Sequence, residues 1–94
     1  MQFLVQTHDA PGANWNGQDD LLRREARYAY ELWQAGSLRQ IWFTDEQDAV
    51  LLLECPDKPA AVAAVESLPL VKNGLLQYTL TQLVPYPGFG RLFE

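Results

Sequence analysis

Cysteine and histidine are almost absent from this chain, which has one of each among its 94 residues. Cys55 therefore has no partner for an internal disulfide bond, and a metal site built from several cysteines cannot form within one chain. The only histidine, His8, lies far from Cys55 in the sequence. A structural thiol is therefore favoured over a nucleophile, which would need a base beside it.

Basic residues are also few. The chain has seven lysines and arginines and twelve acidic residues, which gives a net charge of -5. Nucleic-acid binding depends on clustered basic residues, so this class of partner is not expected. No apolar run approaches the roughly 20 residues of a membrane helix, and the first residues lack a basic segment followed by an apolar one. The sequence predicts a cytoplasmic protein that binds neither nucleic acid nor membrane.

Several motifs that carry chemistry are missing as well. The chain has no glycine-rich phosphate loop, no paired metal-ligand spacing and no nucleophile elbow, so no nucleotide, metal or other cofactor is expected. What is present is an ordinary globular balance of 48% hydrophobic and 20% charged residues. Residues 1–94 fit one domain. A chain of this size buries only about 60 to 65% of its unfolded surface, so association with a partner would help its thin core.

The first half of the chain predicts a strand, a helix and a second strand. Residues 1–8 alternate as in a strand, with Phe3, Val5 and Thr7 on one face and Leu4, Gln6 and His8 on the other. Residues 9–17 are rich in turn formers and predict a loop. Apolar residues then recur at helical spacing over residues 18–35, and Gly36 can end that helix in a left-handed conformation. A β-prone segment follows at Leu38–Phe43.

The second half mirrors the first. After an acidic loop at 44–48, the strand Ala49–Glu54 is apolar at nearly every position, which indicates cover on both faces. Asp57 is the expected N-cap of a helix that runs to about Ser67, and Pro69 is expected to end it. A last strand is predicted over residues 75–84. The tail, 84–94, is too broken by proline and glycine for regular structure but is aromatic, so we expect it to pack against something.

The element order β-α-β-β-α-β predicts an α+β, ferredoxin-like domain. Right-handed crossovers fold this order into a four-stranded antiparallel sheet with both helices on one face. The other face is then bare. Because the Ala49–Glu54 strand is apolar on both sides, we expect a second copy of the chain to cover that face, which gives a homodimeric α+β barrel.

Two residues are candidate proton carriers. Imidazole is the side-chain group suited to proton transfer without large tuning by its surroundings, and His8 lies on the face expected to meet a partner or to line a pocket between layers. A solvated histidine at a strand end is nevertheless the more common case. Glu25, on the first helix, could act as a base if burial raised its pKa. The alternative for Glu25 is a solvated carboxylate paired with the arginines at 23, 24 and 27.

A second group could bind substrate. Arg39 could hold a carboxylate through parallel hydrogen bonds, while the indoles of Trp33 and Trp42 could wall an apolar pocket for a small organic acid. The competing interpretation is that both indoles are core residues and that Arg39 faces solvent. Tyr86, on the tail, could be either a pocket lid or an anchor at an interface.

Three stretches carry a family resemblance: Glu25 on the first helix, the Gly-Ser-Leu-Arg-Gln-Ile-Trp junction at 36–42, and Leu-Pro-Leu at 68–70. Together with the final strand they resemble the muconolactone isomerase family, and the end of the tail is similar to YCII-like domains. The resemblance implies a cofactor-independent proton shift in an unsaturated lactone during aromatic catabolism, using a base and donors that stabilise an enolate.

The chain departs from the family pattern at three positions. It has Leu4, Gln6 and Ala26 where the family has a histidine and two lysines. Two hypotheses follow. One is a muconolactone isomerase-like enzyme in which Glu25 or His8 moves a proton and Arg39 orients an acidic or lactone substrate. The other is a noncatalytic ligand-binding or accessory protein that has kept the barrel and lost the chemistry.

Overall fold

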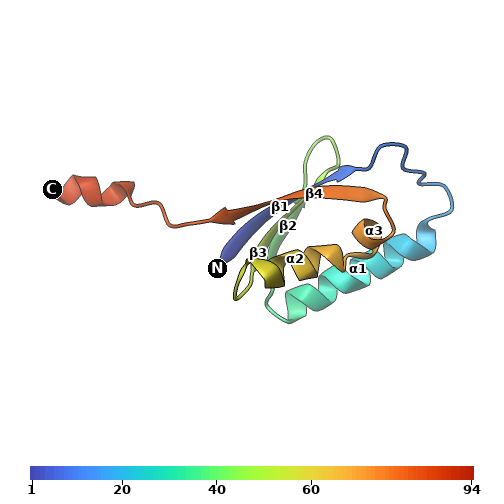
Figure 1. Cartoon of the computed structure of the whole chain (residues 1–94), viewed down its shortest axis with the longest axis horizontal. Helices are drawn as coiled ribbons and strands as arrows, with labels where there is room; N and C mark the ends of the chain where they lie inside the picture. The colour runs from blue at the N-terminus through green and yellow to red at the C-terminus, as the bar shows by residue number, and fades with distance from the viewer.

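The computed structural model describes residues 1–94 and has the expected order of elements, with two additions (Figure 1). The elements are β1 (Gln2–Asp9), α1 (Asp19–Gln34), β2 (Leu38–Phe43), β3 (Ala49–Glu54), α2 (Lys58–Glu66), α3 (Pro69–Lys72), β4 (Leu76–Leu83) and the 3₁₀ helix η1 (Gly88–Phe93). No helix combines the length and the apolar character needed to span a membrane.

The four strands form one antiparallel sheet in the order β2-β3-β1-β4. The central strand β1 pairs with β3 on one side, where Leu4 lies opposite Leu52, and with β4 on the other, where Leu4 lies opposite Thr81. All three α-helices lie on one face of this sheet (Figure 1). The α+β, ferredoxin-like prediction is therefore confirmed.

The alternation along β1 decides what is buried. Phe3 and Val5 have no exposed surface and pack in the main core with Leu53 of β3 and Val65 of α2. On the opposite face, which carries no helix, Leu4 is 39% exposed. We call this the bare face; Leu52 and Val50 of β3 and Trp42 of β2 share it with Leu4, as the strand pairing shows. The third strand is thus apolar on both sides, as predicted.

The helix ends follow local rules in most places. Gly36 adopts a φ of 82° directly after α1, as its role as a stop signal requires. The Asp57 side chain caps α2 by accepting a hydrogen bond of 2.8 Å from the backbone N–H of Ala60. The prediction for Pro69 was wrong. Helix α2 already ends at Glu66, and Pro69 instead begins α3, because proline suits the first turn, where its missing N–H costs nothing.

One prediction for the tail needs correction, because residues 88–93 form η1 rather than irregular chain. The tail does not pack against its own domain, so the expectation that it packs against something stays a prediction. It continues away from the end of β4 as a separate arm (Figure 1). Its largest apolar side chains are exposed: Val84, Tyr86, Phe89, Leu92 and Phe93.

Candidate functional site

A cavity of about 700 Å³ lies between α1 and the sheet. It is at the end of the sheet where β1 and β2 finish and β3 and β4 begin, since Asp9, Phe43, Ala49 and Leu76 all line it. Its walls are mainly apolar. The apolar lining residues are Trp15, Leu22, Ala26, Ala29, Ile41, Phe43, Ala49, Leu51, Leu68, Leu70 and Leu76.

Glu25 is the titratable group that α1 contributes to this cavity. It is half-buried, and its Oε1 accepts a hydrogen bond of 3.0 Å from the backbone N–H of Leu70, in the first turn of α3. Loss of water around the carboxyl raises the pKa of Glu25, and the Leu70 hydrogen bond offsets part of that rise. Glu25 forms no ion pair with the arginines of its helix, so it is not the solvated surface carboxylate of the alternative interpretation.

The other polar lining groups come from segments close to the chain reversals. Thr7, at the end of β1, receives a 3.0 Å hydrogen bond from the backbone N–H of Ala49, so its hydroxyl is held by the sheet. The indole Nε1 of Trp15 donates a 3.3 Å hydrogen bond to Asp9, which ties the loop after β1 to the strand end. Glu46 and Gln47 reach the cavity from the β2–β3 turn, where Gln47 has a φ of 66°.

The charge of the cavity has one sign. Asp9, Glu25 and Glu46 line it, and no arginine, lysine or histidine does. Ala26, one of the departures from the family pattern, places a methyl group on this wall, whereas Leu4 and Gln6 lie on the bare face. An anionic ligand would therefore meet three carboxylates and no positive charge from the same chain.

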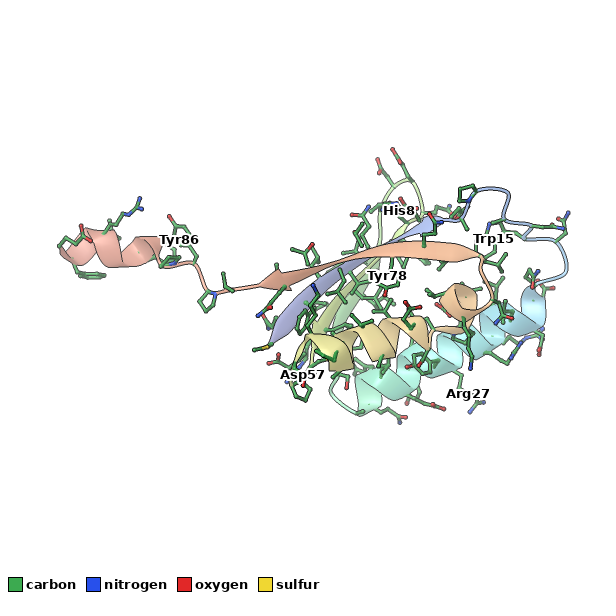
Figure 2. All side chains as sticks on the ribbon, in the orientation of Figure 1. His8, Trp15, Arg27, Asp57, Tyr78 and Tyr86 are labelled. Atoms are coloured by element: carbon green, nitrogen blue, oxygen red, sulfur yellow. The ribbon has the colours of Figure 1, made fainter.

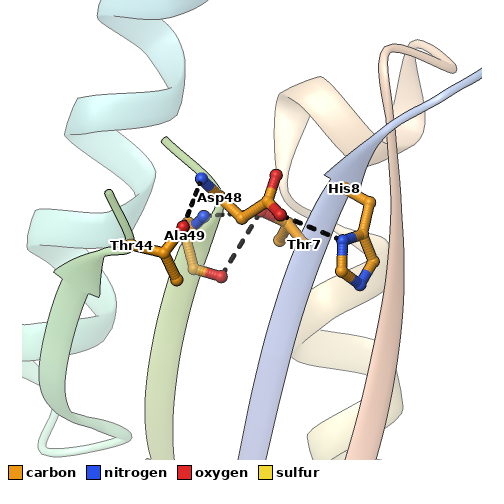
Figure 3. A network of polar contacts seen from close by, with 5 residues as sticks. All are labelled: Thr7, His8, Thr44, Asp48 and Ala49. Carbon is orange, nitrogen blue, oxygen red and sulfur yellow. Dashed lines mark hydrogen bonds and ion pairs between the residues drawn. The ribbon is translucent and has the colours of Figure 1, made fainter. Parts of the chain in front are cut away.

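His8 lies on the other side of the sheet from Glu25. Its Nδ1 is 3.2 Å from Oδ2 of Asp48, and the backbone N–H of Asp48 donates to the Thr44 hydroxyl, so the pair belongs to a polar network at the strand ends (Figure 3). His8 shares the bare face with Gln6, as the alternation predicted. The structure therefore does not bring His8 and Glu25 into one cavity within a chain.

The remaining candidates are also outside the cavity. Arg39 is exposed at an irregularity in the β2–β3 pairing. Trp42 is 60% exposed on the bare face, and Trp33 is 58% exposed on α1, where it stacks on Tyr30 at 5.9 Å. Tyr86 lies out on the tail (Figure 2). None of these side chains belongs to the core, and their assignment as substrate-binding residues stays a prediction.

Trp15 and Asp9 are among the cavity residues that the sequence did not suggest. Both fall in or beside the segment read as a loop, and only the fold shows that this loop returns to the strand end (Figure 2). The apolar residues Ile41 and Phe43 could have been found, because their alternation with Trp42 along β2 places them on the helix-covered face.

The raised pKa of Glu25 predicts a specific pH dependence of stability. In the window above the ordinary carboxyl pKa and below the folded-state pKa, the folded protein binds more protons than the unfolded chain, so its stability falls as pH rises. Glu25→Gln removes this titration while its side-chain oxygen can still accept from Leu70. We expect urea denaturation midpoints across this window to fall less steeply with pH in the variant. Equal slopes in the two proteins would contradict the burial of this carboxyl.

Comparison with known proteins identifies the fold of this chain but no close relative. No protein-family model matches the chain, and no curated protein does. Among solved structures, muconolactone isomerase is 19% identical and superposes with a TM-score of 0.79 over 93% of this chain and 92% of its own. The 5-chloro-2-hydroxyhydroquinone dehydrochlorinase TftG of Burkholderia phenoliruptrix, solved in complex with 2,5-dihydroxybenzoquinone, is 19% identical with a TM-score of 0.72 over 94% and 98%.

An antibiotic biosynthesis monooxygenase is more distant, with 14% identity and a TM-score of 0.55 over 90% of this chain and 100% of its own. At these identities the likeness establishes the fold. This chain therefore shares the fold of muconolactone isomerase, as the sequence resemblance implied.

Proposed function

We propose that this protein is a cofactor-independent, muconolactone isomerase-like enzyme that shifts a proton in a small unsaturated ring compound bound between α1 and the sheet. The observation that carries the proposal is the position of Glu25, a carboxyl half-buried on the wall of an apolar cavity with its pKa raised. A carboxyl whose pKa is raised by burial is better suited to take up and return a proton than an ordinary solvated one.

The reaction needs one group that both takes and returns a proton. Glu25 would remove a proton from a carbon conjugated to the ring carbonyl and deliver it to another carbon of the same system, so that the double bond moves and no atom is gained or lost. Only Oε1 is engaged by Leu70, which leaves Oε2 for the substrate. The intervening enolate needs a donor, and the indole N–H of Trp15, which donates to Asp9 in this structure, is one such group in the cavity lining.

The lining favours a neutral ligand over the organic acid predicted from the sequence. Three carboxylates would repel an acid, and Arg39, the residue expected to hold it, is not in the cavity. An uncharged lactone, phenol or quinone ring suits apolar walls with a few polar groups at one end. The structure of TftG, which shares this fold, contains 2,5-dihydroxybenzoquinone, a single oxygenated six-membered ring. This supports a ligand of one ring for the present cavity.

The second candidate is a noncatalytic binding protein. It is favoured by the small number of free polar groups, since the Thr7 hydroxyl is bonded to Ala49 and the Trp15 N–H to Asp9. In that case Glu25 would be a hydrogen-bonding group that positions a ligand without exchanging its proton.

In either case we propose that the functional unit is a homodimer formed through the bare face. Leu4, Val50, Leu52 and Trp42 provide an apolar centre there, and this face has no cover within the chain. We also propose a cytoplasmic location. The support is the composition of the sequence, which has a single cysteine and an ordinary balance of apolar and charged residues.

The two candidates are separated by incubating the protein with an uncharged β,γ-unsaturated γ-lactone in D₂O and following both binding and isotope exchange by NMR. The enzyme proposal predicts shifts of the Glu25 and Phe43 amides together with deuterium in the lactone and movement of its double bond. Binding without exchange supports the binding protein. If the lactone and its carboxylated analogue bind equally well, the inference from cavity charge is wrong.

A further inference from the structure

Two of the three asparagines in the chain are followed directly by glycine: Asn16-Gly17 in the loop before α1, and Asn73-Gly74 in the turn before β4. Glycine has no Cβ, so its backbone nitrogen can approach the side-chain carbonyl carbon of the asparagine that precedes it. That approach is the first step of deamidation, which turns the amide into a carboxylate. Both asparagines are exposed, so exposure alone does not distinguish them.

Asn73 is held in place by hydrogen bonds. Its side-chain Nδ2 donates a 2.7 Å hydrogen bond to the carbonyl of Pro69, and the N–H of Gly74 donates a 3.0 Å hydrogen bond to the carbonyl of Val71. The next residue, Leu75, is buried in the smaller core cluster. The two reacting groups therefore cannot meet until this turn opens, and the free energy of that local opening slows the reaction.

Asn16 has no such restraint. Neither its side chain nor the N–H of Gly17 forms a hydrogen bond within the protein. The hydrogen bonds of this loop involve other groups: the N–H of Asn16 donates to Oδ1 of Asn14 at 3.0 Å, and Nε2 of Gln18 donates to the carbonyl of Asn14 at 3.2 Å. We therefore propose that Asn16 is a site of spontaneous deamidation in the folded protein, and that this change alters the wall of the cavity.

The reaction needs only water as its co-reactant. The backbone nitrogen of Gly17 gives up its proton and forms a bond to Cγ of Asn16, while the bond from Cγ to the amide nitrogen breaks and ammonia leaves. Water then opens the resulting cyclic imide at either of its carbonyls. One opening gives aspartate. The other gives isoaspartate, in which the main chain runs through the former side chain and is longer by a methylene group.

The consequence for the cavity follows from the neighbouring residue, Trp15. It lines the cavity, and its 3.3 Å hydrogen bond to Asp9 ties the loop to the end of β1. The loop is anchored by β1 at one end and by α1 at the other, so a longer main chain after Trp15 changes the path between two fixed points. Isoaspartate should therefore displace the indole from Asp9, whereas aspartate adds charge without changing the path. The inference holds whether the cavity is catalytic or only binds a ligand.

The test incubates fresh protein in warm, mildly alkaline buffer and measures each asparagine separately by peptide mapping and mass spectrometry. We expect Asn16 to convert at least about tenfold faster than Asn73, because two hydrogen bonds must open before Asn73 can react. In urea, where neither turn is folded, the two sites should convert at similar rates, since each is followed by glycine. Equal rates in the folded protein, or slow conversion of Asn73 in urea as well, would overturn the proposal.

A second measurement follows the cavity wall by NMR of ¹⁵N-labelled protein. A new indole N–H signal for Trp15 should grow at the rate at which isoaspartate forms, while the indole signals of Trp33 and Trp42 stay single. Asn16→Gln keeps an amide but would have to close a larger ring, so its Trp15 signal should stay single during the same incubation. Asn16→Asp adds the charge alone and should give the Trp15 signal of fresh wild type. Conversion of Asn16 to isoaspartate with an unchanged Trp15 signal would overturn the effect on the cavity while leaving the proton-shift hypothesis standing.

Discussion

Glu25→Gln will lower the rate of any proton shift catalysed in the cavity by about 10²–10⁴-fold, the range that one positioned acid or base contributes. Glutamine preserves the size of the side chain and can accept the Leu70 hydrogen bond, so the fold and ligand affinity should change little. The measurement is kcat and KM for double-bond migration in the substrate. We expect the loss to fall on kcat, because the missing group acts in the transition state.

Two variants serve as comparisons. Glu46→Gln removes a carboxylate from the same cavity, but from the exposed β2–β3 turn, and should change kcat by less than about tenfold. His8→Ala tests the other proton carrier predicted from the sequence; because His8 lies across the sheet from the cavity and beside Asp48, we expect wild-type turnover. Wild-type turnover in Glu25→Gln would remove the catalytic assignment.

Phe3→Ala will destabilise the domain by about 3–5 kcal/mol, as expected for a fully buried aromatic residue in the middle of a core. Phe3 has no exposed surface and belongs to the cluster that joins β1 and β3 to α2. Small domains have a total stability of about 5–15 kcal/mol, so this one substitution removes a large share. Urea denaturation should show a lower midpoint with an unchanged slope.

The neighbouring substitution Leu4→Ala provides the matched control. Leu4 lies on the bare face and is 39% exposed, so its truncation should cost clearly less than that of Phe3 in a dilute, monomeric sample. If the bare face joins two copies, the cost of Leu4→Ala will grow with protein concentration. A Phe3→Ala cost no larger than that of Leu4→Ala would contradict the burial pattern of β1.

The elements were predictable because their signals are local. Alternation along β1, the left-handed stop at Gly36 and the capping side chain of Asp57 each act within a few residues, and each is present in the structure. Pro69 shows the limit of such signals. A proline is compatible both with ending one helix and with beginning another, and in the structure Pro69 begins α3, whose Leu70 packs in the smaller core cluster.

The site was less predictable because it depends on faces and on loop closure. The sequence predicts that both helices lie on one face of the sheet and that His8 lies on the other face. The separation of His8 from Glu25 could therefore have been derived from the sequence. The contact between Trp15 and Asp9 could not, because it depends on how residues 10–18 return over the end of β1. The charge of the cavity likewise emerges only when three separate segments meet.

The apolar residues are divided between two clusters. The main one centres on Phe3 and Leu53, while Leu21, Leu70 and Leu75 form a smaller one with Trp15 near the cavity. Separate clusters can come apart independently, so the segments around the cavity can open briefly while the central strands keep their amide hydrogens from exchanging with solvent. Because Leu51 and Leu68 of the main core also line the cavity, changes of specificity at low cost to the fold are confined to substitutions in the smaller cluster.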